Sequence, residues 1–177
     1  TVFSPAGTYS LVPTIANPNY EPSFQSGILE ILPAPLTIMA KDATRGYGQS
    51  NPAFEVKVSG LVGVDTIASI KGLGATTVAT NLSPIGTYSI VPKGTNSNYQ
   101  INYVPATLEI TPAVLVIAAK AQTKYYGDPN PIFSTIVSGL VNGDKESDIQ
   151  GLGAYSTNLT GGNAGLYPIY PTGSNPN

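Results

Sequence analysis

The sequence contains no cysteine, histidine or tryptophan, and only one methionine. Without thiolate or imidazole groups, a Cys/His zinc site, a thiol nucleophile and a Ser-His-Asp relay are all excluded, because each needs one of these side chains. Charge is scarce as well, since Asp, Glu, Lys and Arg make up 10% of the 177 residues, against a usual share of about 25%. We therefore expect no enzyme activity and no cofactor.

The charge that is present also limits the partners. The formal net charge is −2 and there is no run of basic residues, so binding to nucleic acid lacks its usual electrostatic contribution. No stretch approaches the roughly 20 apolar residues of a membrane span, and the start Thr1-Val2-Phe3 does not have the pattern of a secretory leader. We expect a mature chain or an excised piece, with no nucleic-acid partner and no membrane insertion.

What is present in quantity is apolar, turn-forming and tyrosine residues. Hydrophobic residues make up 41% of the chain, beside 19 Gly, 16 Pro and 11 Tyr. A chain with this much apolar surface and so few charges is expected to fold. Its abundance of turn residues indicates a mainly β structure.

The strongest feature is internal repetition at an offset of 79 residues, the step from Gly7 to Gly86. The superposition needs no gap, and about half of the superposed positions are identical, far above chance. The recurring segments include Ala40-Lys41, Tyr47-Gly48, Asn51-Pro52, Val58-Ser59-Gly60-Leu61-Val62 and Gly72-Leu73-Gly74-Ala75, all of which return 79 residues later. The chain is therefore an array.

Prolines mark the boundaries of the repeat units. Pro33, Pro35 and Pro112 each stand between two alternating apolar runs, where the missing N–H of proline suits a strand end or a stiff linker. We therefore predict one complete unit over 35–113. Residues 1–34 are then the C-terminal part of a unit, and 114–177 are a unit that lacks its last strands.

Within the complete unit, hydrophobic periodicity predicts a mainly β domain. Alternating apolar residues indicate strands, and the 65–70 segment indicates a short helix because Ile67 and Ile70 are three residues apart. The predicted strands are 36–41, 54–58, 75–80, 88–91 and 99–110. This order favours small tandem domains that are β-grasp-like, with one short helix per unit. The alternative is an immunoglobulin-like β-sandwich in which 65–70 is a loop.

A succession of short motifs resembles a known family. The motifs are Tyr126-Gly127-Asp128-Pro129-Asn130-Pro131, Val137-Ser138-Gly139-Leu140-Val141-Asn142-Gly143-Asp144, Gly86-Thr87-Tyr88, Asn98-Tyr99-Gln100-Ile101-Asn102-Tyr103 and Leu108-Glu109-Ile110-Thr111. Together they resemble the MBG domain of the YGX type, which occurs in tandem in large bacterial surface proteins and adhesins. The first copy departs at Gly46-Tyr47-Gly48-Gln49, which has no Asp, and residues 20–27 lack the usual alternating strand. The resemblance implies an exported, extracellular, non-enzymatic cell-surface protein and names no ligand.

The Tyr-Gly pairs are candidate site residues. Tyr47-Gly48 and Tyr126-Gly127 are consistent with an exposed aromatic platform for sugars or a protein partner. The interpretation that we favour is structural: the ring packs at a strand end, the hydroxyl bonds to a turn, and the glycine supplies a positive φ. A fold has reason to recur at a fixed spacing, whereas a catalytic site does not.

Carboxylates form the second group of candidates. Asp65 and Asp144 are predicted to cap short helices rather than to act as catalysts. The run from Asp144 through Glu146 to Asp148 places acids on alternate positions, as calcium loops do. It lacks the Gly and the distal Glu of such a loop, so calcium is a weak candidate and we predict no metal site.

Three functions follow, from three classes. The leading prediction is a structural and adhesive repeat module, a stalk or spacer on the cell surface, with weak binding of a host or environmental glycan or protein. The second is a subunit of an extracellular filament assembled head to tail, in which residues 20–34 supply strands that 114–177 lacks. The third is a carbohydrate-binding module. The expected partners are neighbouring repeats or identical subunits.

Overall fold

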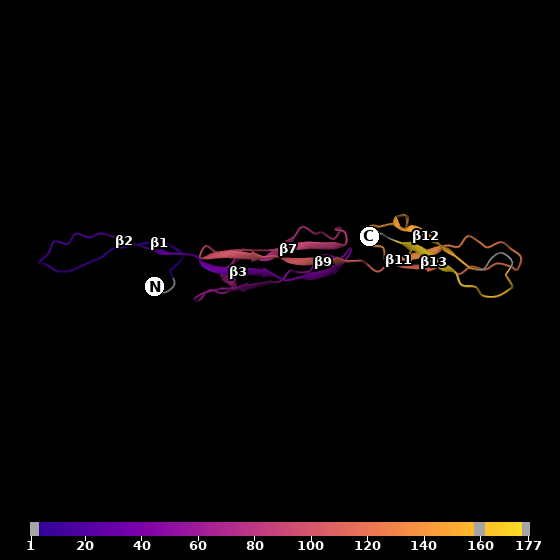
Figure 1. Cartoon of the computed structure of the whole chain (residues 1–177), viewed down its shortest axis with the longest axis horizontal. Coiled ribbons are helices and arrows are strands. Elements are labelled where there is room, and N and C mark those ends of the chain that lie inside the picture. Colours follow the sequence, from indigo (N-terminus) through magenta and orange to yellow (C-terminus); the bar gives the residue numbers. More distant parts are fainter. Residues whose placement is uncertain (1–3, 158–161, 175–177) are drawn as a thin grey trace. The chain divides into compact units, whose positions relative to one another are not determined.

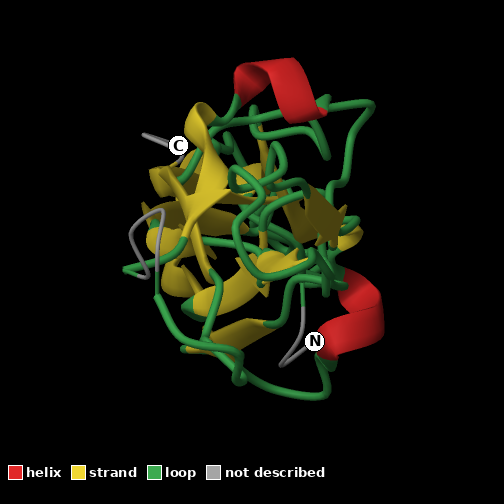
Figure 2. Cartoon of the chain, turned by 90° about the vertical axis from the view of Figure 1, so that its right-hand side faces the viewer, coloured by secondary structure: helices red, strands yellow, loops and turns green. Residues whose placement is uncertain are grey.

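The computed structural model describes residues 4–157 and 162–174. Strands take up 44% of them and helical residues only 4%, and Figure 2 shows strands and loops throughout, with short helical turns. The prediction of a mainly β structure is confirmed. The chain divides into two compact units, of which the first contains Thr1–Ala43, Ala53–Val78 and Tyr88–Leu108 and the second Thr44–Pro52, Ala79–Thr87 and Glu109–Asn177.

A three-stranded sheet lies on one side of the complete repeat. β3 (Ala34–Ala40) is its central strand, with β5 (Val56–Ser59) antiparallel on one edge and β8 (Tyr99–Val104) parallel on the other. Leu36 and Ile38 of β3 are buried, because residues two apart in a strand point to the same face. β3 therefore contributes two of the largest buried side chains of the molecule.

A four-stranded sheet makes the other side, in the order β4-β9-β7-β6. Figure 1 shows β7 and β9 together, with β3 beside them. Ile90 in β7 and Leu108 in β9 are fully buried, so this sheet also turns an apolar face inward. The strands are β4 (Ala43–Gly46), β6 (Lys71–Thr77), β7 (Gly86–Thr95) and β9 (Ala106–Thr111).

The two sheets approach closely at Gly94 of β7. A Cβ atom at this position would lie 2.8 Å from Cγ2 of Ile70 and 3.1 Å from Cδ1 of Ile38. Ile70 and Ile38 belong to the buried core cluster, against which Leu73 of β6 also packs. The glycine is therefore required by a close approach of backbone to core.

The predicted helix over 65–70 is wrong. The structure has a single three-residue 3₁₀ turn, η1 (Ile67–Ser69), and its counterpart η2 (Glu146–Asp148); the described residues contain no α-helix. Ile67 and Ile70 do not share a face, since Ile67 is exposed while Ile70 is buried and already extended. Ile70 packs into the sheet core, so its three-residue spacing from Ile67 does not mark the apolar face of a helix.

The β-grasp arrangement is not supported either, because it needs a helix that covers the sheet. Two facing sheets are shared with the immunoglobulin-like alternative, but the parallel pairing of β3 with β8 departs from that fold's two antiparallel sheets. The predicted strand 99–110 is divided at Pro105. Proline lacks the N–H that a continuous ladder needs, and β8 and β9 join different sheets.

Residues of the first partial repeat form a hairpin. β1 (Gly7–Leu11) pairs antiparallel with β2 (Gly27–Ile31), and residues 12–26 between them contain no strand. The counterpart of β8 would fall at 20–25 in the 79-residue register. β8 pairs with β3, and no counterpart of β3 lies within 1–34, so this segment has no strand to pair with there.

In the third repeat the same pairings return. β10 (Val116–Ala119) pairs with β11 (Thr135–Ser138), and β12 (Gln150–Tyr155) pairs with β13 (Tyr170–Ser174). Val116 faces Ser138, as Thr37 faces Ser59 one repeat earlier. The register shift between Gln150 and Gly153 repeats the shift between Lys71 and Gly74. The 79-residue period of the sequence is therefore also a period of the backbone pairing.

Candidate functional site

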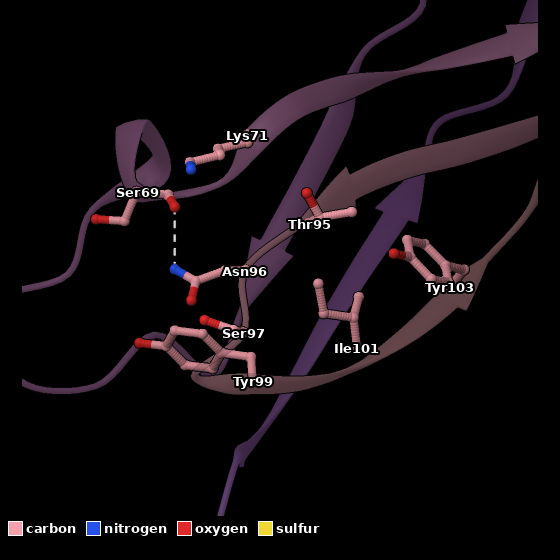
Figure 3. Close-up of a pocket in the computed structure, with 8 residues that line it drawn as sticks. All are labelled: Ser69, Lys71, Thr95, Asn96, Ser97, Tyr99, Ile101 and Tyr103. Atoms are coloured by element: carbon pink, nitrogen blue, oxygen red, sulfur yellow. Dashed lines mark hydrogen bonds between the residues drawn. The ribbon is translucent and has the colours of Figure 1, made fainter. Parts of the chain in front are cut away.

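The first candidate is an open hollow of about 640 Å³ in the first compact unit. Tyr99, Ile101 and Tyr103 line it from one face of β8, as Figure 3 shows, because alternate residues of a strand share a face. The other lining residues are Ser69, Lys71, Thr95, Asn96 and Ser97. The hollow thus combines aromatic, hydroxyl and amide groups with one amine.

Hydrogen bonds fix the wall of this hollow. Asn96 Nδ2 donates to the carbonyl of Ser69 at 2.9 Å (Figure 3). The Tyr99 hydroxyl donates to Asp65 Oδ2 at 2.7 Å and accepts from the N–H of Val62 at 3.1 Å. Burial is the main cause that raises the pKa of Tyr99, and the Asp65 carboxylate adds to it. The phenol therefore stays protonated at neutral pH and acts as a hydrogen-bond donor.

The chemistry of the hollow is limited to binding. No carboxylate is among its described lining residues, whereas glycoside hydrolysis ordinarily needs two carboxyl groups that face each other across the scissile bond. Lys71 is the charged side chain of the lining, and the remaining polar groups are uncharged. Such a surface suits a polar or aromatic ligand held by hydrogen bonds and stacking.

The second candidate is the Tyr47-Gly48 turn, which a buried arginine holds in place. Arg45 at the end of β4 is 5% exposed, and its Nε donates to Asn51 Oδ1 at 2.8 Å. Its two terminal nitrogens donate to the carbonyls of Gly46 and Thr80. Asn51 in turn donates to the carbonyl of Ala79 at 2.6 Å. The turn is thus positioned by a charged group whose donors are satisfied by backbone and amide oxygens.

The turn meets residues of the next repeat, all within the second compact unit. The Tyr47 hydroxyl lies 3.5 Å from Asp144 Oδ1, which is long for a hydrogen bond between oxygens. Gly48 has a φ of +81°, and a Cβ there would lie 2.7 Å from Cγ2 of Val141. Asn142 Nδ2 donates to the carbonyl of Asn81 at 2.9 Å. Consecutive repeats are therefore in direct contact here, and we call these contacts the joint.

The second Tyr-Gly pair has different surroundings. Tyr126 is 73% exposed, and at Gly127, where φ is +92°, a Cβ would have no atom within 4 Å. Both residues line a hollow of about 250 Å³, together with Phe133 and Tyr167. The same two residue types are thus engaged in one repeat and open in the other.

The predicted helix-capping role of Asp65 and Asp144 is wrong by one position. The residues that precede the two turns are Thr66 and Lys145. Instead, Asp65 accepts the hydroxyl hydrogen of Tyr99, and Asp144 faces Tyr47. Both carboxylates therefore face phenols rather than the first N–H groups of the turns.

The weak calcium candidate does not form a site. Among the residues that the structure describes, no group of three acidic side chains lies close enough to hold a metal ion. Asp148 Oδ2 accepts the N–H of Lys145 at 2.8 Å, which leaves it directed at its own turn, while Asp144 faces Tyr47. The alternating acids therefore diverge.

Comparison with family models gives a match over 36–109 and again over 115–177 to the MBG domain (YGX type). The chain belongs to the MBG domain family. It carries two tandem copies, and the unit boundaries at 34/35 and 113/114 stay a prediction beside these matched ranges. No curated protein and no solved structure is significantly similar to the chain. None of the helical segments in 4–157 and 162–174 has the length and hydropathy to cross a membrane.

Sequence reasoning did not identify three residues on which these sites of the MBG repeat depend. Arg45 is the buried charged residue of the described chain, and an isolated arginine next to a strand in a charge-poor sequence is the signal that identifies it. Tyr99 is predicted only as a strand residue within a family motif. Asn98, whose side chain accepts the N–H of Ala6 at 3.0 Å, was seen only within the family motif.

Proposed function

We propose that the chain is a non-enzymatic spacer module of an extracellular bacterial surface protein, in which MBG repeats follow one another through direct joints. The observation that carries the proposal is the contact of Gly48 with Val141, which joins two family copies that recur in one register. A spacer needs repeats whose ends meet in a fixed way, because each repeat then adds a defined increment of length.

Adhesion is the second part of the proposal. The hollow beside Tyr99 and Tyr103 offers an aromatic and amide surface with one amine, that of Lys71, and open surfaces of this kind bind sugars or peptides weakly. Weak binding at each repeat becomes strong overall binding when many repeats engage at once. We therefore propose host or environmental glycans, or proteins, as low-affinity partners of the array at the cell surface.

The spacer proposal is tested by small-angle scattering. The chain is compared with variants in which residues 35–113 are duplicated once and twice after position 113. We expect the maximum dimension to increase by the same increment with each added copy, while the cross-section stays constant. Added copies that pack side by side and increase the cross-section would overturn the spacer proposal.

A filament is a second candidate because β13 has an open edge. β13 pairs only with β12 among the described strands, whereas its counterpart β7 lies between β6 and β9. Open edges accept strands from other subunits, and residues 20–34 are the segment that would supply them. Electron microscopy over a series of chain concentrations is the test. Fibres would support this candidate, and the absence of fibres at millimolar concentrations of the chain would reject it.

A further inference from the structure

The joint between the second and third repeats shows what the Tyr-Gly turn contacts. Gly48 lies against the side chain of Val141 so closely that no Cβ fits. Tyr47 faces Asp144, which lies three residues after Val141. The surface on one side of the joint is therefore a Tyr-Gly turn, and the surface on the other is a Val-x-x-Asp segment.

Each of these surfaces occurs a second time in the chain, in an open state. Tyr126-Gly127 is the second Tyr-Gly turn, and it borders a hollow of about 250 Å³. Val62 and Asp65 form the second Val-x-x-Asp segment, 79 residues before Val141 and Asp144. Val62 is 55% exposed, whereas Val141 is half-buried. Val62 and Tyr126, which lack the joint contact, are therefore more exposed than their counterparts Val141 and Tyr47.

We propose that the hollow at Tyr126-Gly127 is a docking site for the Val62–Asp65 segment of a second copy of this chain. The occupant is identified by the established joint, because the chain itself places a Val-x-x-Asp segment on an equivalent turn. Val62 fills the hollow beside Gly127, and Asp65 faces Tyr126. The proposal rests on the tandem arrangement proposed above and adds the residues through which separate copies meet.

The carboxylate of Asp65 has the capacity for this second contact. Its Oδ2 accepts the hydroxyl hydrogen of Tyr99 from its own repeat. At the joint, the oxygen of Asp144 that faces Tyr47 is Oδ1. An ionised carboxylate accepts hydrogen bonds on both oxygens, so one aspartate receives an internal tyrosine on one oxygen and a tyrosine of the docked copy on the other.

Docking of a second copy lacks one contact of the joint inside the chain. Asn142, which donates to Asn81, corresponds to Gly63, which has no side chain. Both residues have positive φ, +57° for Asn142 and +66° for Gly63, so the backbone turn is shared while the amide is missing. We therefore expect association between copies to be reversible and to depend on concentration.

Sedimentation velocity of the full chain from micromolar to millimolar concentration tests the proposal. We expect reversible association of the unmodified chain. Gly127→Asn blocks the turn with a residue that tolerates positive φ, and Val62→Asp places a charge on the exposed valine. Each variant alone is expected to bind itself at least about tenfold more weakly, which corresponds to about 1.4 kcal/mol.

A mixture of the two blocked variants gives the decisive result. Gly127→Asn retains an open Val62–Asp65 segment and Val62→Asp retains an open turn, so we expect the mixture to form heterodimers and no larger species. Ile132→Ser is the matched control, because Ile132 is 94% exposed, lies five residues after Gly127 and is not among the residues that line the hollow. The control is expected to associate like the unmodified chain.

Three results would overturn the docking site. These are a monomer up to millimolar concentration, association that neither blocked variant weakens, and a mixture that behaves like its separate components. None of them affects the spacer proposal, which is tested by the increment of length per repeat. A failed increment together with successful docking would reject the spacer proposal alone.

Discussion

The second and third repeats have equivalent strand pairings but differ in burial. Leu36 and Ile38 of β3 are 2% and 0% exposed, whereas their counterparts Leu115 and Ile117 are only half-buried. β3 has a partner strand on each side, β5 and β8, while among the described strands β10 pairs only with β11. Local sequence therefore suffices to set the register of a pair of strands, but a buried core requires the additional strands β8 and β9.

The ends of the two repeats differ in the same way. Arg45 is buried and holds the Tyr47 turn, whereas Lys124 at the equivalent position is exposed and donates to the carbonyl of Asp128. β4 pairs with β9, and the third repeat contains no counterpart of β9 within the sequence. The Arg45 contacts that hold the Tyr47 turn are therefore not repeated at Lys124.

The largest expected difference between the repeats lies in their cores. Ile38→Ala removes a fully buried side chain and leaves a cavity, so we expect a loss of about 4 kcal/mol in the free energy of unfolding. Ile117→Ala is expected to cost about 1 kcal/mol, because the side chain is already partly in water. Urea unfolding of each variant gives both values. Equal losses would mean that the two cores are equally packed.

The sequence predicts those features of the fold that depend on neighbouring residues, and it does not predict those that depend on contacts between distant residues. The repeat, the strands near 36–41 and 54–58, and the turn at Gly48 follow from local patterns. The division of 99–110 at Pro105 does not follow from alternation, because alternation continues on both sides of the proline. The assignment of β8 to one sheet and β9 to the other is a long-range choice.

The site residues illustrate the same limit. Positive φ at Gly48 follows from its position in a turn, but its contact with Val141 depends on a residue 93 positions away. The role of Asp65 was predicted from the residues that follow it, and its actual partner is Tyr99. Spacing indicates a local cap, whereas only the folded repeat brings the phenol to the carboxylate.

The second-largest expected effect concerns Arg45 and Lys124, the basic residues at equivalent positions of the two repeats. Arg45→Ala removes the donors that satisfy the Asn51 amide oxygen and two carbonyls, so we expect a loss of about 3 kcal/mol in the free energy of unfolding. Lys124→Ala, the matched change at an exposed position, is expected to alter it by no more than about 0.5 kcal/mol. Thermal and urea unfolding measure both. A similar small effect at both positions would show that the Arg45 network does not stabilise the turn.

A smaller effect is expected at the two glycines of the joint motif. Both have positive φ, so alanine costs about 1 kcal/mol at Gly48 and at Gly127. Gly48→Ala should cost about 2 kcal/mol more, because the new Cβ overlaps Val141. Hydrogen exchange read by mass spectrometry should show faster exchange in 141–149 for Gly48→Ala alone. Equal exchange in the two variants would contradict the joint.

The smallest expected effect concerns the stability of the fold at alkaline pH. Asp65 accepts the hydroxyl hydrogen of Tyr99 in its own repeat, whereas Asp144 faces Tyr47 of the preceding repeat. The pKa of Tyr99 is raised in the folded state, so the unfolded chain loses this proton at a lower pH, near 10. The stability that the neutral phenol contributes is therefore complete below pH 10 and is lost as the pH rises through the folded pKa. Tyr99→Phe removes this contribution, so urea midpoints between pH 8 and about 12 should fall less steeply for the variant than for the unmodified chain.

Tyr126→Phe is the control, since Tyr126 is exposed and its removal should leave the slope unchanged. Parallel slopes for Tyr99→Phe and the unmodified chain would show that the neutral Tyr99 phenol does not account for the alkaline loss of stability.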